Sequence, residues 1–167
     1  GRTPEYLGKK VETREMKFAL LGVLAHPLFI LGGTALFAAT SWGTETVLNS
    51  GFHGFSEILY EFTSSSANNG SGFEGLGDNT VPWNVATGLV MLLNRFIPIV
   101  FPMAIVGSLA SKKASPETAG TLRTDTPLFG CVLFGCVLFV GALLFMPAAV
   151  LGPIADHLVN VAGIAAN

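Results

Sequence analysis

The sequence is short of charge. Only 12% of its 167 residues are Asp, Glu, Lys or Arg, whereas soluble domains usually carry about 25%. Half of the residues are hydrophobic, and the mean hydropathy is +0.59. This composition excludes an ordinary soluble domain and indicates an integral membrane protein. The net charge of −2 says little, because the position of the charges matters more than their sum.

Motifs of common enzymes are also missing. The sequence has no Gly-rich phosphate-binding motif, no HExxH and no GxSxG elbow. We therefore expect no catalytic chemistry and no ATP on this chain, and no nucleic acid as a partner. The two cysteines, Cys131 and Cys136, lie in an apolar run and are predicted to be buried and reduced. On a helix they would point about 140° apart, which argues against a disulfide between them.

The beginning of the chain lacks the layout of a signal peptide. Residues 1–17 are polar and look like a loop leading into a helix, with five cations: Arg2, Lys9, Lys10, Arg14 and Lys17. Because Gly1 opens this loop, we expect the chain to be the C-terminal part of a longer polypeptide.

Three apolar stretches are long enough to cross about 30 Å of hydrocarbon. They cover residues 18–41, about 83–108, and 128–151, and they are separated by a polar linker at 109–127 and followed by a tail at 152–167. His26 and Pro27 interrupt the first span, which predicts a kink with the imidazole facing other helices; a proton or ion ligand is the alternative. Pro98 and Pro102 should bend the second span.

The cations predict the orientation. Residues 1–17 carry five and the linker 109–127 carries three, whereas residues 42–82 and the tail carry none. Positive loops stay in the cytoplasm, so residues 42–82 and the C-terminus are expected to face outside. Trp42 and Trp83 bracket residues 42–82 and are expected to anchor helices at headgroup level.

Residues 52–77 combine two incompatible halves. Residues 52–63 suit an amphipathic helix of about three turns, too short to span and too apolar for a loop. Residues 64–77 are rich in Ser, Asn and Gly and cannot face lipid. The pattern favours a half-helix that re-enters the membrane and ends in a loop of reachable carbonyls, as a site for a dehydrated cation requires. A helix lying flat on the outer surface, followed by a solvated turn, is the alternative.

Several separated motifs resemble one family. EFTSSSANNGSGFEGLG at 61–77, GRTPEYLGKK at 1–10, LNRFIP at 93–98 and the later ASKK, GTL and PLFG are similar, in order, to the potassium-binding subunit (A chain) of the Kdp-type potassium-transporting ATPase. The resemblance implies an all-α membrane protein: the fourth of four potassium-channel-like helix–pore loop–helix repeats (18–108), with one additional transmembrane helix. Each repeat would give one loop to an outward-facing selectivity filter in the bacterial inner membrane.

The resemblance also implies partners. The three other pore repeats of the same subunit would complete the filter. A separate P-type ATPase catalytic subunit, with small accessory membrane subunits, would drive the ion onward. K⁺, taken from the periplasm, is the transported ion, and the lipid bilayer surrounds the chain.

The resemblance assigns the site residues. Those expected to form the filter, with K⁺ at the first three, are Asn68, Asn69, Gly70 and Ser71. Glu61 and Gly72 are expected to support it, Glu61 by accepting backbone N–H bonds. Arg95, near the middle of the second span, would be a positive charge in the pore below the filter; a structural ion pair is the alternative.

Other functions remain open at this point. A self-sufficient potassium channel or Trk-like symporter unit could use the same loop. A helix bundle that serves assembly and has no binding site is a further alternative. His53, Glu57 and Glu61 share one helical face, so a membrane metalloenzyme is the candidate of another class. Glu57 is otherwise expected to point into the outer vestibule and attract cations.

Overall fold

The computed structural model describes residues 4–117, 120–146 and 151–162. The chain divides into two compact units, residues 1–116 and 117–167. Several predictions fall outside the described residues: the start at Gly1, the cation Arg2, the end of the third span at 147–150 and the end of the tail.

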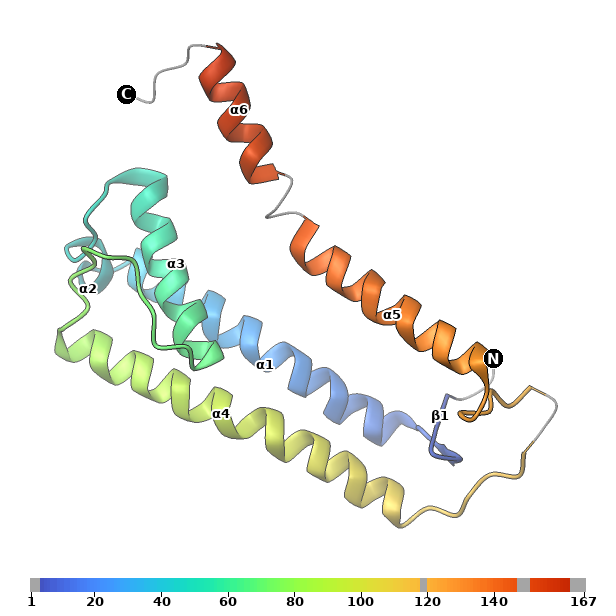
Figure 1. The fold of residues 1–167 in the computed structure, drawn as a ribbon. Helices are drawn as coiled ribbons and strands as arrows, with labels where there is room; N and C mark the ends of the chain where they lie inside the picture. The colour runs from blue at the N-terminus through green and yellow to red at the C-terminus, as the bar shows by residue number, and fades with distance from the viewer. Residues whose placement is uncertain (1–3, 118–119, 147–150, 163–167) are drawn as a thin grey trace. The chain divides into compact units, whose positions relative to one another are not determined.

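The described elements are mostly helices (Figure 1). In chain order they are β1 (Glu5–Tyr6), β2 (Lys9–Lys10), α1 (Thr13–Ala38), α2 (Ser41–Thr44), α3 (Gly51–Ala67), α4 (Val81–Ala110), α5 (Pro127–Met146) and α6 (Gly152–Ala162). Among the described residues, α1, α4 and α5 are long and apolar enough to cross a membrane. The predicted all-α membrane fold is confirmed.

A small hairpin precedes α1. Strands β1 and β2 pair antiparallel, with Glu5 opposite Lys10. The two residues between them, Leu7 and Gly8, have φ of 51° and 69°, as a tight two-residue hairpin turn of the I′ kind requires. The sequence reasoning treated this segment as a plain loop.

Helix α1 begins at Thr13, five residues before the predicted start. Glu12 and Glu15 form a reciprocal capping box there, which satisfies backbone N–H groups of the first turn. The helix continues through Pro27. The imidazole of His26 faces α3, as predicted, with Nδ1 2.7 Å from Ser66 Oγ.

Helix α4 begins where Thr80 accepts a hydrogen bond from Trp83 N at 3.5 Å. It runs as one helix through Pro98 and Pro102 to Ala110. With α1 and α3 it forms the main body of residues 1–116, because each of these three helices packs against the other two.

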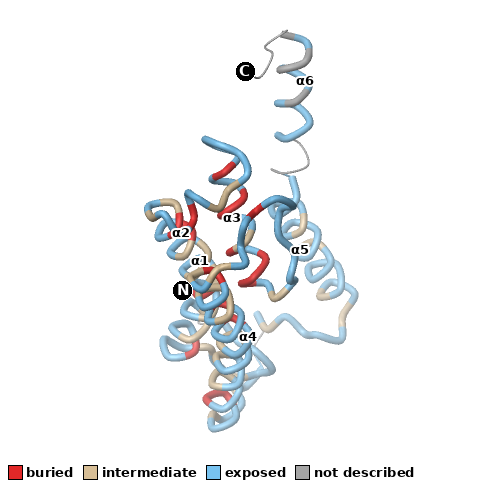
Figure 2. The backbone as a smooth tube through the Cα atoms, turned by 90° about the vertical axis from the view of Figure 1, so that its left-hand side faces the viewer, coloured by how far each residue is buried: buried red, intermediate tan, exposed pale blue. Residues whose placement is uncertain are grey.

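The core of this body is aromatic. The ring of Trp83 lies 4.3 Å from that of Phe37 and 5.3 Å from that of Phe62, between centroids. Its Nε1 donates to Thr46 Oγ1 at 3.0 Å. The prediction that Trp83 anchors the helix at the headgroups was wrong, because its side chain is fully buried; Trp42 is 48% exposed. Figure 2 shows buried residues concentrated on α3.

Helix α5 is apolar on all sides and has no buried residue. Cys131 and Cys136 are unpaired, as predicted, but exposed, so the prediction that they are buried was wrong for this chain. An apolar helix needs no protein cover when hydrocarbon surrounds it. Helix α6 follows within residues 117–167, so the described part of the predicted tail is helical.

Candidate functional site

Helix α3 is longer than predicted. It ends at Ala67, four residues beyond the expected half-helix, so the serine run 64–66 belongs to the helix and not to the loop. All three serines are buried. Serine favours turns because its hydroxyl competes for backbone hydrogen bonds, but here the hydroxyls of Ser64 and Ser66 have partners outside α3.

The helix ends in a left-handed bend. Asn68 has φ 58° and ψ 35°, and its N–H donates to Ser65 O at 3.1 Å. The N–H of Asn69 donates to Ser64 O at 3.0 Å. This pair of bonds is the Schellman ending of a helix, with Asn in the position that Gly usually holds. The chain therefore reverses sharply at the first predicted filter residue.

The loop then folds back against α3. The N–H of Ser71 donates to Ser64 Oγ at 2.9 Å, and Ser71 Oγ lies 3.0 Å from Tyr60 Oη. Gly70 has φ +76°, and no atom lies within 4 Å of the place where a Cβ would be. Residues 69–71 are exposed. The structure thus gathers the four predicted filter residues in one tight, accessible turn.

The hydrogen bonds of this turn are one-sided. Backbone N–H groups of Asn68, Asn69 and Ser71 are all donated inward to α3. Within the described part of the chain, the carbonyl oxygens of residues 68–71 accept no hydrogen bond. The turn can therefore offer up to four backbone oxygens to a cation.

Arg95 lies beside this turn. Its Nε donates to Asn68 Oδ1 at 3.3 Å, and Asn68 Nδ2 donates to Ser66 O at 3.3 Å. Arg95 pairs with no carboxylate in the described residues. The guanidinium contacts the first predicted filter residue directly.

Glu61 does not brace the loop as predicted. It accepts no backbone N–H among the described residues; Ser65 Oγ lies 3.4 Å from its Oε1, and Oε2 is buried without a partner. The loop N–H of Ser71 is taken by Ser64 instead. Glu61 contacts Gly72, where a Cβ would lie 2.6 Å from Oε2. Burial, with the nearby charge of Asp78, raises the pKa of Glu61.

Glu57 also departs from its prediction. Its carboxylate is buried and accepts hydrogen bonds from Leu48 N at 2.8 Å and from Asn49 N and Nδ2 at 3.1 and 2.7 Å. Burial alone would raise its pKa, but these bonds outweigh burial and lower it. Glu57 therefore ties down the segment before α3 and does not point into a vestibule.

This arrangement weakens the metalloenzyme alternative. Both oxygens of Glu57 are occupied, and His53 is exposed. In the part of the chain that the structure describes, no three His, Cys, Asp or Glu side chains gather as a metal site would require.

A buried polar cluster was missed by sequence reasoning. Ser66 Oγ lies 2.7 Å from His26 Nδ1 of α1 and 2.9 Å from Asn94 Nδ2 of α4. Ser66 is fully buried, and Asn94 is 3% exposed. The signal for it was weak: a histidine and an asparagine inside two apolar spans. Such groups in a span usually pair with each other or mark a functional site.

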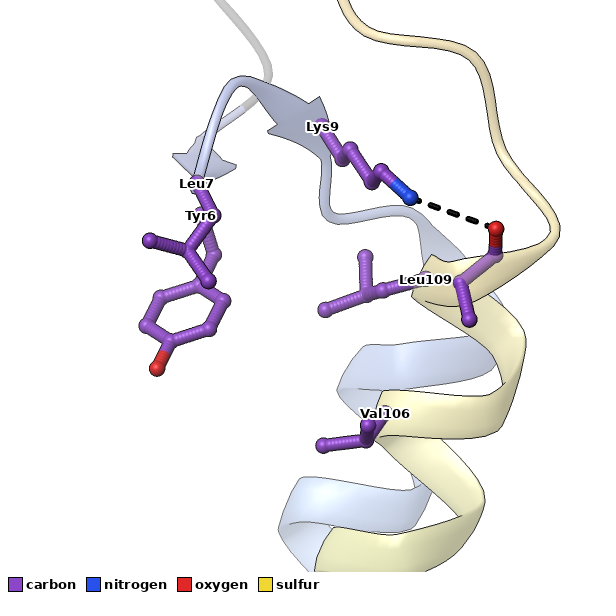
Figure 3. Close-up of a pocket in the computed structure, with 6 residues that line it drawn as sticks. Tyr6, Leu7, Lys9, Val106 and Leu109 are labelled. Carbon is purple, nitrogen blue, oxygen red and sulfur yellow. Dashed lines mark hydrogen bonds between the residues drawn. The ribbon is translucent and has the colours of Figure 1, made fainter.

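The opposite end of α1 and α4 carries charges instead. Lys112 Nζ lies 2.7 Å from Glu15 Oε2 and 2.8 Å from Glu12 Oε2, and Ser108 Oγ donates to Glu15. Beside them, Tyr6 and Leu7 of the hairpin and Val106 and Leu109 of α4 line a pocket of about 250 Å³, where Lys9 Nζ donates to Ala110 O (Figure 3). None of the predicted site residues lies in this pocket.

The fold is that of an all-α membrane protein. Two helices long and apolar enough to cross a membrane, α1 and α4, pack against the shorter helix α3. Helix α3 ends at a left-handed bend and is followed by a loop whose carbonyl oxygens at residues 68–71 accept no hydrogen bond in the described residues. The chain belongs to the family described as the potassium-transporting ATPase A subunit, whose family model matches residues 1–158. The family suggested by the sequence is confirmed.

One curated relative shows how much of such a protein this chain represents. Over 158 residues the chain is 55% identical to the potassium-transporting ATPase potassium-binding subunit of Geobacillus kaustophilus (strain HTA426). The match covers 95% of this chain and 28% of that protein, so the chain spans about 28% of the length of this relative.

Proposed function

We propose that this chain supplies one loop of a potassium selectivity filter. K⁺ would bind to the backbone carbonyls of Asn68, Asn69 and Gly70, with Ser71 closing the site. The observation that carries the proposal is the one-sided bonding of the turn: the N–H groups of Asn68, Asn69 and Ser71 are held by α3, while the carbonyl oxygens of residues 68–71 accept no hydrogen bond in the described residues. Carbonyl oxygens of this kind replace the water that K⁺ loses.

The electrostatics of α3 support the same ion. The C-terminal end of a helix carries about half a negative charge, which favours a cation next to it. Arg95 touches the side chain of Asn68 and not the free carbonyls. It contributes a positive charge beside the bound ion, which disfavours strong retention and shapes the exit below the filter.

One loop cannot surround an ion. Three further pore repeats of the same polypeptide would complete the filter, since the chain spans only 28% of the length of its relative. The chain itself catalyses no reaction and binds no ATP. A P-type ATPase catalytic subunit, together with small accessory membrane subunits, supplies the energy for high-affinity uptake.

The distribution of cations supports the orientation. Residues 1–17 and the linker 109–127 lie in the cytoplasm, while the filter loop and the C-terminus face the periplasm of a bacterial inner membrane. In this arrangement α3 re-enters the membrane from outside, and residues 68–77 return surrounded by protein or lining water, because irregular backbone at membrane depth cannot face lipid.

Substitution of Gly70 tests the proposal. Gly70→Asp adds a charge and a Cβ at a position with φ +76°, next to the proposed carbonyl ligands. In the complete subunit, assembled with its partners, we expect the apparent affinity for K⁺ uptake to fall at least about tenfold. Gly88→Ala is the matched control, because Gly88 lies in α4 with no atom within 4 Å of an added Cβ. Unchanged K⁺ affinity in Gly70→Asp would contradict the filter assignment.

A density map offers an independent test. In the assembled complex soaked with Rb⁺, the heavier ion should give a peak within coordination distance of the carbonyls of residues 68–70. A Rb⁺ peak elsewhere in the complex, with no peak at this turn, would contradict the assignment of the ion site to residues 68–70.

A further inference from the structure

We propose that His26 and Asn94 are positioning residues of the filter. Through Ser66 they fix where α3 ends and the loop begins, and so set the discrimination between K⁺ and closely similar cations. The inference rests on the proposed function of residues 68–71.

The three side chains meet at a single oxygen. Asn94 Nδ2 can only donate, so Ser66 Oγ accepts at 2.9 Å. His26 Nδ1 lies 2.7 Å from the same oxygen, and the imidazole tautomer decides which of the two atoms donates. One buried hydroxyl therefore joins α1, α3 and α4.

This junction is close in sequence to the proposed ligands. Ser66 is in the last turn of α3, and Asn68, two residues later, takes the left-handed bend. Asn68 Nδ2 donates back to Ser66 O, so the two sides of the bend are also joined to each other. A rotation of Ser66 would therefore move Asn68 with it.

Helix α4 holds both sides of the bend with consecutive residues. Asn94 contacts Ser66 on the helix side, and Arg95 contacts Asn68 on the loop side. Because residues 94 and 95 are adjacent on one rigid helix, they fix the distance between the two contacts. Sites that must hold a ligand within about 0.5 Å need such support behind their first ligands.

The cluster is also suited to its place because it contains no carboxylate. A buried carboxylate at this junction would add a negative charge that competes with the carbonyl oxygens for the cation, whereas the hydroxyl of Ser66 and the amide of Asn94 hold the end of α3 through a directional hydrogen bond. Cation discrimination depends on the size of the oxygen cage or on the number and strength of its dipoles. Either quantity changes if the end of α3 shifts.

The test compares uptake of K⁺ and Rb⁺ in the complete subunit assembled with its partners. Ser66→Ala removes the shared oxygen. We expect the KM for K⁺ to rise at least about tenfold and the ratio of the KM values for K⁺ and Rb⁺ to change at least about threefold, with kcat nearly unchanged. Asn84→Leu is the matched control, since Asn84 is exposed on α4, the helix of Asn94, and within the described residues its side chain hydrogen-bonds the side chain of Asn79.

A second variant separates positioning from folding. Leaving one buried polar group without its partner is costly, but replacing all partners by apolar groups can be nearly neutral. The triple variant His26→Leu, Ser66→Ala, Asn94→Leu should therefore assemble, yet show the altered KM ratio. A wild-type ratio in an assembled triple variant would overturn the inference. Failure of every variant to assemble would make the cluster a folding determinant and would overturn it too.

Gly70→Asp, measured in the same assay, separates this inference from the proposed function. If Gly70→Asp abolishes high-affinity uptake while the cluster variants keep wild-type ratios, only the positioning role fails. If Gly70→Asp leaves K⁺ affinity unchanged, the filter assignment fails, and the positioning role fails with it.

Discussion

The two ends of the α1–α4 pair are held together by different chemistry. At the loop end, side-chain hydrogen bonds centred on Ser66 and an aromatic core around Trp83 join the helices. At the other end, a buried carboxylate, Glu15, is paired with Lys112. Both ends are tightly bonded, but only the second uses opposite charges.

The difference has a physical reason. If the turn binds K⁺ as proposed, a fixed negative charge beside it would hold the ion too strongly, and the junction at Ser66 accordingly joins the helices through hydroxyl and amide dipoles. Its one deeply buried carboxylate, Glu57, is fully engaged by backbone and amide N–H groups. The end with Lys112 has no such constraint, and an ion pair joins α1 to the residues after α4.

The largest effect on stability is expected from a substitution in the aromatic core of the loop end. Trp83→Ala should lower the free energy of unfolding by about 3–5 kcal/mol, because a large, fully buried side chain is replaced by a cavity. Trp42→Ala, at a site that is 48% exposed, should cost clearly less. Thermal unfolding of the purified complete protein measures both, and equal losses would show that Trp83 is not the centre of the core.

The next effect concerns the charged end. Lys112→Met should lower the unfolding temperature by several degrees, because Glu15 is left buried without its cation. Lys113→Met, at the exposed neighbouring position, is the control and should change little. Comparable losses in the two variants would make the ion pair unimportant.

This effect should depend on pH. Hydrogen bonds to Glu12 and Glu15 raise the pKa of Lys112. A raised lysine pKa gives stability that is fully present below the ordinary lysine value and is lost as the pH rises through the raised value. The gap in stability between wild type and Lys112→Met should therefore stay constant near neutral pH and narrow as the pH rises into strong alkali. A gap that already narrows at neutral pH would contradict this account.

A smaller effect separates the bend from the Arg95 contact. Both Asn68→Ala and Asn68→Gly lose the side-chain hydrogen bonds to Arg95 and to Ser66 O, but only Ala puts a residue that tolerates φ 58° poorly at the bend. We expect Ala to be less stable than Gly by about 1 kcal/mol, the lower end of the range for such backbone strain. Equal stability of the two variants would mean that the bend is not retained.

The smallest effect is expected at Gly72. An added Cβ would meet only Glu61 Oε2, the movable end of a flexible side chain, so Gly72→Ala should change K⁺ affinity by no more than a few-fold. In a Glu61→Ala background the same substitution should have no effect. Persistence of the effect without Glu61 would show that Gly72 acts through another contact.

Sequence reasoning predicted the spans, the family and the turn at residues 68–71, because each leaves a local signal in hydropathy or motif. It misplaced the end of α3, since three serines read as a turn until their tertiary partners are known. It placed Trp83 at the interface and Glu57 in a vestibule, because neither local spacing nor composition fixes which way a side chain faces. The Ser66 junction joins residues 40 and 28 positions apart, beyond the reach of any local pattern.

Pro98 interrupts the backbone hydrogen bonding of α4 close to the residues that contact the end of α3 and the loop. A proline has no N–H, so the carbonyl of Asn94, four residues earlier, loses the donor that an α-helix would give it. Because Pro102 removes a second backbone hydrogen bond in the same way, we expect α4 to bend more easily between residues 94 and 102 than between residues 81 and 93. Bending in this segment would leave the contacts of Asn94 and Arg95 with the end of α3 unchanged.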